Sequence, residues 1–385
     1  MTQHDIKKIA IIMGTRPEAI KLAPVIKALE KERCLEPTVV STGQHREMLA
    51  QVVDTFDIKV DTDLNVMRPD QSLAGLSACL MQGLDVWLSQ ALPDMVLVQG
   101  DTTTVFIAAL VSFYQRIPLG YVEAGLRTGN LFSPFPEEAN RRLATPLMDL
   151  YFAPTEEARQ NLLAEGINDA GITVTGNTVI DALHMEIQRQ KDIVVQQRIF
   201  GQLAEVIASD WQEKPYVLIT GHRRENFGAG FRQICQGLVA LARRFRDIRF
   251  IYPVHLNPNV QKTVRELTGG IDNIFLIPPQ EYSQFVSLMA HCQLILTDSG
   301  GVQEEAPALG KPVLVMRDTT ERPEGVNAGT VKLIGANADL IVQETSNLLL
   351  DPVAYEEMSH ATNPYGDGHS SARIVQRINT FFRQI

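Results

Sequence analysis

Three acidic residues occupy positions from which they could transfer protons. Asp101 and Glu123 each stand at the end of a short apolar run, and Glu137 lies in a proline-containing loop just before a helical pattern. Carboxylates in a partly desolvated cleft can serve as general acid or base. Each residue also has a simpler explanation: Asp101 as a helix cap, Glu123 as the ion-pair partner of Arg127, and Glu137 as a solvated helix start. Three carboxylates at comparable positions favour catalysis.

A second group of residues suits a phosphate. After the apolar run 294–297 come Asp298, Ser299, Gly300 and Gly301, and then a helical pattern. Glycines allow a tight turn, and the free amides of a helix start bind anions. Glu305 follows about one turn into the helix, where it can accept hydrogen bonds from the hydroxyls of a ribose. An ordinary turn before an acidic helix is the alternative. The dinucleotide fingerprint is absent at Gly14, which lacks two further glycines, so a nicotinamide cofactor is disfavoured.

Basic residues follow the first apolar run of each half of the chain. Arg16 and Lys21 follow the first run, and both can meet a diphosphate. His222 follows the run 216–220 and can donate to an anion or act as a general acid. The alternatives are solvated surface charges, and a simple ion pair between Arg224 and Glu225.

The elements that must position these residues alternate between strand and helix patterns. The strands predicted in the first half are 8–13, 37–42, 95–99, 118–122, 151–153 and 172–174; those of the second half are 216–220, 249–253, 274–277, 294–297, 313–316 and 331–334. Such alternation predicts an α/β fold with two doubly wound, Rossmann-like parallel sheets. Ligands bind beyond the carboxyl ends of such strands, so the polar residues are expected to face one shared cleft.

Length and composition agree with a two-domain enzyme. The chain has 385 residues, more than one core usually supports. We predict an N-terminal domain over 1–177, a second domain over 178–365, and a tail over 366–385 that carries an amphipathic helix at about 371–382.

Charge, hydropathy and cysteine content indicate which partners and which cellular compartment to expect. The net charge of −10 makes nucleic-acid binding an unfavourable hypothesis. No stretch approaches the roughly 20 apolar residues of a membrane span. The start of the chain is polar and unlike a signal peptide. The four cysteines lack metal or redox spacing and are expected to be thiols of a cytoplasmic protein.

Several separated motifs carry a family resemblance. They lie at 14–21, 99–104, 122–128, 136–141, 175–178, 221–225 and 297–301. In order and spacing the chain resembles the bacterial non-hydrolysing UDP-N-acetylglucosamine 2-epimerases from residue 9 to about 373. The resemblance implies the two-domain architecture of the B-type glycosyltransferases, with UDP held mainly by the second domain. It also implies a C-terminal helix that crosses back to the first domain, and a homodimer.

The resemblance further implies a role for each candidate residue. It assigns the diphosphate to Arg16, His222, Ser299 and Gly301, uracil to Gln280 and Phe285, the ribose to Glu305, catalysis to Asp101, Glu123 and Glu137, and further active-site contacts to Lys21 and Arg322. A second site, where UDP-N-acetylglucosamine activates some members, is suggested around Gln44, His45, Arg46, Arg68 and His255. Gln99 stands where the family often has His before Gly-Asp.

The reaction implied is reversible epimerisation at C2 of UDP-N-acetylglucosamine, by elimination of UDP to a 2-acetamidoglucal and re-addition, without NAD or metal. The product would supply N-acetylmannosamine for surface polysaccharide. Four alternatives remain open: a hydrolysing relative that releases N-acetylmannosamine, a glycosyltransferase, a non-catalytic UDP-sugar sensor, and an epimerase for a modified sugar.

Overall fold

Two units make up the chain, Met1–His184 with Tyr365–Ile385 (unit 1) and Met185–Pro364 (unit 2). The computed structural model describes residues 6–44, 46–68, 70–221, 223, 226 and 228–384, without the side chains of residues 46–48 and 259. The prediction that 1–177 and 178–365 are separate domains stays a prediction.

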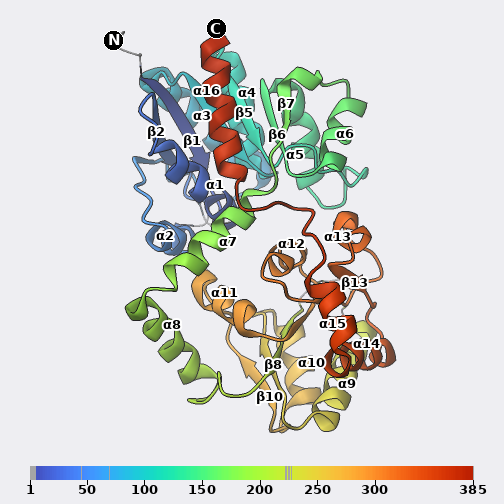
Figure 1. Cartoon of the computed structure of the whole chain (residues 1–385). Coiled ribbons are helices and arrows are strands. Elements are labelled where there is room, and N and C mark those ends of the chain that lie inside the picture. The colour runs from blue at the N-terminus through green and yellow to red at the C-terminus, as the bar shows by residue number, and fades with distance from the viewer. Residues whose placement is uncertain are drawn as a thin grey trace. The chain divides into compact units, whose positions relative to one another are not determined.

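Unit 1 is built on a seven-stranded parallel sheet with the order β3-β2-β1-β4-β5-β6-β7 (Figure 1). Its strands are β1 (Lys7–Met13), β2 (Leu35–Ser41), β3 (Thr62–Asp63), β4 (Met95–Gln99), β5 (Leu119–Val122), β6 (Leu150–Ala153) and β7 (Ile172–Val174). Its helices are α1 (Arg16–Leu29), α2 (Arg46–Thr55), α3 (Leu73–Ala91), α4 (Thr103–Tyr114), α5 (Glu137–Ala144), α6 (Glu156–Ala164) and α16 (Ser370–Gln384), while α7 (Thr178–Arg189) runs across the division between the units.

Unit 2 repeats this plan with six parallel strands in the order β10-β9-β8-β11-β12-β13. The strands are β8 (Tyr216–Thr220), β9 (Arg249–Pro253), β10 (Ile274–Ile277), β11 (Leu294–Thr297), β12 (Val313–Val315) and β13 (Val331–Leu333). The helices are α8 (Ile193–Val206), α9 (Ala229–Arg244), α10 (Pro258–Thr268), α11 (Tyr282–His291), α12 (Gly300–Ala308), α13 (Pro323–Asn327), α14 (Ala338–Leu350) and α15 (Pro352–Ser359).

The predicted pair of doubly wound Rossmann-like sheets is therefore confirmed. Each predicted strand is present, with ends that differ by at most two residues. The sequence missed β3, because a two-residue edge strand leaves no periodic signal.

The strand order reverses at one point in each sheet. β1 pairs with both β2 and β4, and β8 pairs with both β9 and β11. Helices that follow neighbouring strands at such a point leave toward opposite faces, so a crevice opens at the carboxyl ends. Arg16 begins the helix after β1 and Asp101 lies in the loop after β4, while the loops after β8 and β11 carry Arg223 and Asp298.

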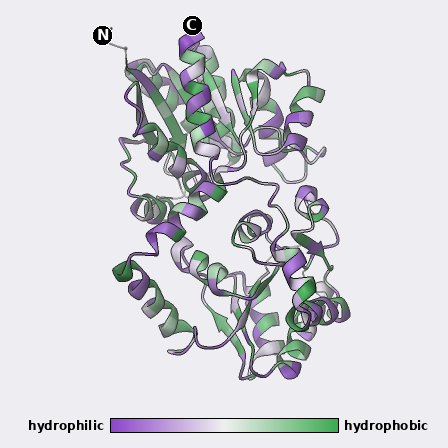
Figure 2. Ribbon diagram, in the orientation of Figure 1, coloured by the Kyte–Doolittle hydropathy of each residue, from purple (hydrophilic) through white to green (hydrophobic). Residues whose placement is uncertain are grey.

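The central strands are apolar because helices cover both faces of each sheet. All of β4 is buried, and β8 is buried except for its last residue. Strands covered on both faces read as continuous hydrophobic runs. Figure 2 shows hydrophobic strands within each sheet and mixed colours on the helices around them.

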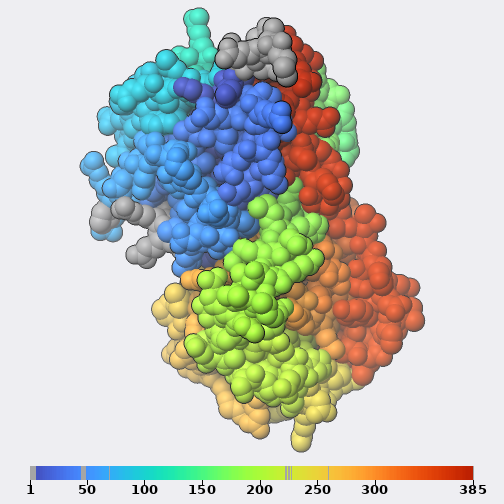
Figure 3. Space-filling model, turned by 60° about the vertical axis from the view of Figure 1, so that its left-hand side comes forward, coloured from blue at the N-terminus to red at the C-terminus, as the bar shows by residue number. Residues whose placement is uncertain are grey.

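The last helix belongs to unit 1. Helix α16 packs on α1, and Figures 1 and 3 show it in red beside the blue N-terminal segments. The Asp181 carboxylate accepts the backbone N–H groups of Ser370 and Ser371 at 3.1 and 2.8 Å, which caps the helix start. Ile374 and Ile378 are fully buried. The capped and buried face of α16 thus completes the core of unit 1.

The cysteines are thiols, as predicted. Cys34 and Cys79 are half-buried, and Cys235 and Cys292 are buried. Burial raises the pKa of Cys235 and of Cys292 to about 12. Within the described part of the chain, no helix combines the length and apolar character needed to cross a membrane.

Gly125, just after β5, provides a test of this packing. Its φ is +90°, and an added Cβ would lie 2.2 Å from the backbone oxygen of Ala158 on α6. Gly125→Ala should lower the free energy of unfolding by about 3 kcal/mol or more, because backbone strain adds to a clash that side chains cannot relieve. Denaturant unfolding followed by circular dichroism measures it.

Gly129→Ala is the matched control. Gly129 also has a positive φ, +76°, but nothing lies within 4 Å of its added Cβ. Gly129→Ala should lower the free energy of unfolding by only about 1 kcal/mol, which is the cost of the backbone strain alone. Equal losses for the two variants would contradict the assigned packing of the 123–125 turn on α6.

Candidate active site

Glu123 adopts an unusual backbone conformation directly after β5. Its φ is +66°, in the left-handed region, and only 8% of the residue is exposed. This conformation costs a non-glycine residue about 1–2 kcal/mol, so it persists only where the surroundings enforce it. A glutamate in this strained conformation indicates that its side chain serves a function at this position.

Three segments hold the Glu123 carboxylate. Its Oε1 accepts hydrogen bonds from Lys21 Nζ of α1 and from Asn177 Nδ2, the latter at 2.9 Å. Its Oε2 accepts one from Gln99 Nε2 at the end of β4. One positive charge and two amide donors stabilise the negative charge of the carboxylate. Lys21, interpreted from the sequence as a charge for a diphosphate, thus pairs with Glu123.

Asp101 is held by α5. Its Oδ2 accepts a hydrogen bond from Arg141 Nη2 at 2.6 Å, and its backbone oxygen accepts one from Asn140 Nδ2 at 2.9 Å. Arg141 also donates to the fully buried Glu138 at 3.1 Å. Burial acts to lower the pKa of Arg141, but Asp101, Tyr121 and Glu138 together outweigh it, so the pKa is raised. Arg141 therefore stays charged and ties the loop after β4 to α5.

Glu137 lies at the start of the same helix. It precedes Asn140 and Arg141 by three and four residues, which places the three side chains on one face of α5. That face contacts Asp101. Glu137 Oε2 is buried and has no hydrogen-bond partner among the described residues. Asp101 therefore lies against the helix that Glu137 begins, and Gln99, two residues before Asp101, donates to Glu123.

Glu18 joins the loops after β1 and β4. Its Oε2 accepts the backbone N–H groups of Gly14 and Thr15, each at 2.7 Å, and its Oε1 accepts the hydroxyl of Thr102. Burial raises the pKa of Glu18 above its usual value, against the lowering by these hydrogen bonds. Thr15 is the N-cap of α1, and the half-buried Arg16 is the first residue of that helix.

Two of the simpler interpretations are wrong. Arg127 forms a two-point ion pair with Glu165, with both distances 2.7 Å, whereas Glu123 pairs with Lys21. Thr102 caps α4, whereas the Asp101 side chain pairs with Arg141. Both carboxylates therefore remain candidates for chemistry.

In unit 2, Asp298 and Arg223 connect the loops after β11 and β8. Asp298 is fully buried and accepts the backbone N–H of Arg223 at 2.8 Å. Ser299 is the N-cap of α12, which begins at Gly300. A Cβ added at Gly300 would lie 3.9 Å from Arg223 Nη2. Arg223 Nε is buried without a hydrogen-bond partner among the described residues. A guanidinium beside open amides at a helix start suits a phosphate.

The remaining predicted contacts of unit 2 lie on or near α11 and α12. Glu305 is half-buried on α12, with Oε1 3.5 Å from a Cβ added at Gly301. Arg322 donates through Nε to the buried Glu304 of α12. Gln280 Nε2 donates to Pro278 at 2.7 Å, and Phe285 is half-buried on α11.

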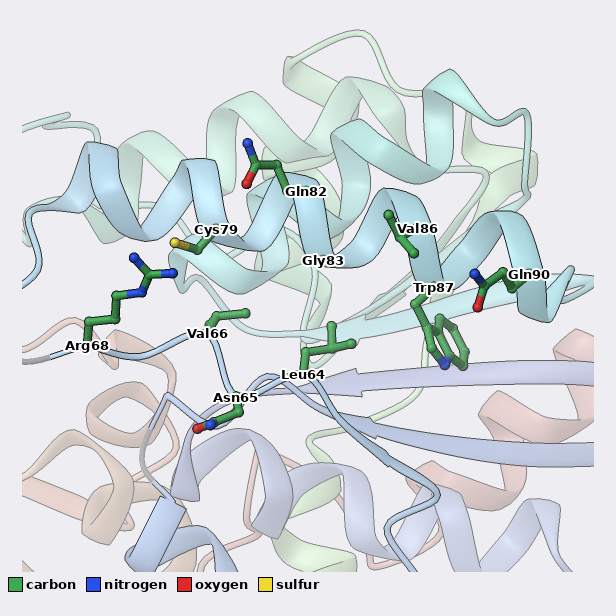
Figure 4. A pocket seen from close by; sticks show the side chains of 10 residues that line it. All are labelled: Leu64, Asn65, Val66, Arg68, Cys79, Gln82, Gly83, Val86, Trp87 and Gln90. Carbon is green, nitrogen blue, oxygen red and sulfur yellow. The ribbon is translucent and has the colours of Figure 1, made fainter.

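The residues suggested for an activating site are only partly described. Gln44 accepts a hydrogen bond from Thr104 at 3.2 Å beside the β1 and β4 loops. Arg68 is exposed and lines a pocket of about 480 Å³ between the segment after β3 and α3 (Figure 4). Trp87 and Cys79 line the same pocket. His255, in unit 2, is exposed.

Several predicted residues fall outside this description. His45, His222, Arg224 and Glu225 lie outside the described residues. Among the residues that are described, no group of three or more His, Cys, Asp or Glu side chains is arranged to hold a metal ion.

The sequence interpretation missed four partners: Gln99, Asn177, Arg141 and Arg223. Each stands inside a motif that was singled out, and Gln99, Arg141 and Arg223 lie near residues that received a role. Only the fold shows which side chain of a motif turns toward another motif. The sequence therefore contained these residues within recognisable motifs, but it did not show which residues they contact.

Comparisons with known proteins agree with this geometry. The family model described as UDP-N-acetylglucosamine 2-epimerase matches residues 27–379. The chain is 53% identical over 374 residues to "UDP-N-acetylglucosamine 2-epimerase" of Salmonella typhimurium, covering 97% of this chain and 99% of the relative. It is 52% identical over 371 residues to the Escherichia coli K12 protein of the same name, covering 96% and 98%.

Solved structures give the same result. The UDP-GlcNAc 2-epimerase of Neisseria meningitidis, bound to UDP-GlcNAc, superposes with a TM-score of 0.88 at 48% identity, covering 97% of this chain and 100% of the other. The Methanocaldococcus jannaschii enzyme, in complex with UDP-GlcNAc and UDP, has a TM-score of 0.79 at 33% identity, covering 97% and 99%. This chain belongs to the UDP-N-acetylglucosamine 2-epimerase family.

Proposed function

We propose that the protein interconverts UDP-N-acetylglucosamine and UDP-N-acetylmannosamine by anti elimination and re-addition of UDP, without hydrolysis of the sugar nucleotide. The observation that carries the proposal is the strained, clamped Glu123 together with Asp101 and Glu137. The sugar is neutral and sits beside an anionic diphosphate, so binding alone gives no reason to gather three carboxylates.

The first half-reaction needs a base and a stabilised leaving group. C2 of the sugar is not adjacent to a carbonyl, so its proton becomes acidic only as the C1–O bond breaks. A carboxylate takes the proton, the C2–H electron pair becomes the C1–C2 double bond, and UDP leaves with the C1–O electron pair. The products held are UDP and 2-acetamidoglucal.

The second half-reaction reverses these steps on the other face. A carboxylic acid returns a proton to C2, and the UDP oxygen bonds to C1. The carboxylates of Glu123 and Asp101, held by Lys21 and Arg141, and the carboxylate of Glu137 supply the groups for these two proton transfers. C2 loses and regains a proton rather than a hydride, so the reaction balances without NAD, and we propose that it needs no metal.

In this proposal donors of unit 2 match the charge that develops on UDP, and the family resemblance adds Arg16 to them. The N-terminus of α12 at Gly300 and Gly301 presents backbone amides, and Arg223 lies beside them. Preorganised donors of this kind stabilise a leaving diphosphate. In this proposal His222 and Ser299 contact the diphosphate, Glu305 the ribose, Gln280 and Phe285 the uracil, and Arg322 completes the site.

The family resemblance supports further parts of the proposal. We place the enzyme in the cytoplasm as a homodimer that supplies N-acetylmannosamine for surface polysaccharide. Activation by UDP-N-acetylglucosamine near Gln44, His45, Arg68 and His255 belongs to the same proposal.

Proton NMR in deuterated water tests the reaction directly. Purified protein with UDP-N-acetylglucosamine alone should give UDP-N-acetylmannosamine carrying deuterium at C2. Free N-acetylmannosamine with UDP would instead indicate hydrolysis. An unchanged spectrum from a protein that binds the sugar nucleotide would favour a transferase, a modified-sugar epimerase or a sensor.

Amide substitution tests the three carboxylates. Asp101→Asn, Glu123→Gln and Glu137→Gln should each lower kcat by at least about 10²-fold, because each removes a group that exchanges a proton or stabilises charge. Asp169→Asn is the control, since Asp169 is an exposed carboxylate paired with Arg159 at 2.8 Å. Near-normal turnover of any of the three variants would remove that residue from the mechanism.

Arg223 gives a test of UDP binding that does not depend on catalysis. Arg223→Met should raise the Kd for UDP about tenfold, because a charge-assisted hydrogen bond to phosphate is lost. Titration calorimetry with UDP measures the change. The exposed Arg246, changed to Met, should leave the Kd unaltered. Equal Kd values for both variants would place the diphosphate away from Arg223.

A further inference from the structure

Gln99 is a buried amide at the inner edge of the candidate site. It is the last residue of β4, only 2% exposed, and its Nε2 donates to Glu123 Oε2. Strand β4 is the neighbour of both β1 and β5, so Gln99 approaches Glu123 from the centre of the sheet.

The two other donors described above bind the opposite oxygen. Lys21 and Asn177 both donate to Glu123 Oε1. Asn177 is itself oriented, because its Oδ1 accepts the backbone N–H of Val179 at 3.1 Å. Gln99 therefore binds the second oxygen, Oε2, and so fixes the rotation of the carboxylate plane.

We infer that Gln99 is the positioning residue of Glu123, and that it sets the orientation of the carboxylate through a donor that does not titrate. This inference rests on the proposed function. An amide keeps one hydrogen-bond pattern across the physiological pH range, whereas an imidazole at this position would change its charge near pH 6.5. The pH dependence of the activity of this chain should therefore contain no ionisation that arises from residue 99.

Two nearly isosteric variants separate positioning from packing. Gln99→Met keeps the volume and removes the donor. Gln99→Glu keeps the shape and places a carboxyl group against Glu123. Two adjacent carboxyl groups share one proton and ionise in coupled steps, so the second proton leaves at a raised pH. While the proton is shared, the carboxyl group introduced at position 99 donates as the amide does.

We expect kcat of Gln99→Met to fall about 10–100-fold with KM within about twofold, because a misplaced reacting group costs rate rather than binding. For Gln99→Glu, kcat relative to the unsubstituted protein should decrease as pH rises from about 5 to 8, as the pair loses its shared proton. The circular dichroism spectrum and the denaturant midpoint of each variant should match those of the unsubstituted protein, which shows that the variant is folded.

Gln115→Glu is the matched control. Gln115 Nε2 also donates to a carboxylate, Asp85 Oδ1 at 2.9 Å, but on the exposed surface. The same chemical change there should leave kcat and the pH profile unaltered.

Three outcomes decide the inference. An active unsubstituted protein with Gln99→Met within twofold of its kcat would overturn it, and so would a Gln99→Glu pH profile that matches the control. Were Gln99→Met to misfold, the Gln99→Glu profile would still decide. Absence of C2 deuteration in the unsubstituted protein would overturn both the proposed function and this inference. The variant results overturn only the inference, so the two failures are distinguishable.

Discussion

The carboxylate of Glu123 joins parts of the chain that are far apart in sequence. The donors to it among the described residues come from α1, from the end of β4 and from the segment after β7, and each arrives at the carboxyl side of the sheet. A left-handed backbone at a glutamate is unfavourable by itself, so these contacts must hold it. The position of this one side chain therefore depends on the strand order, which brings the three donors together, and on the loop that carries Asp101.

The two units order the loops after their central strands in the same way. A reversal of strand order leaves the loops after two neighbouring strands free, and a buried acidic residue then ties one loop to the other. Glu18 does this in unit 1 by accepting hydrogen bonds from the loops after β1 and β4. Asp298 does it in unit 2 by accepting the backbone N–H of Arg223. In each case a carboxylate orders the backbone amides of the loops.

Much of the fold could be predicted because its signals are local. Buried parallel strands such as 216–220 are continuous apolar runs, and turn residues mark their ends. The two-residue β3 lacks such a signal. The candidate carboxylates were also predictable, since their place after strands follows from the chain alone.

The partners of those carboxylates were not predictable in the same way. Arg127 lies four residues from Glu123 yet binds Glu165, whereas Lys21, more than a hundred residues upstream, binds Glu123. Sequence distance carries little information on ion pairs across a sheet, because pairing depends on which loops the strand order brings together. The ion-pair partner of a charged side chain can therefore be assigned only once the fold is known.

The return of α16 to unit 1 has a consequence for biosynthesis. Unit 2 is one continuous stretch of chain, whereas unit 1 is interrupted and closes only with residues near the C-terminus. A nascent chain leaves the ribosome from its N-terminus, so unit 2 can finish folding during translation. The surface of α1 that α16 covers remains open through the synthesis of every residue of unit 2. Completion of unit 1 therefore waits until α16 has been synthesised, although the strands of unit 1 are made first.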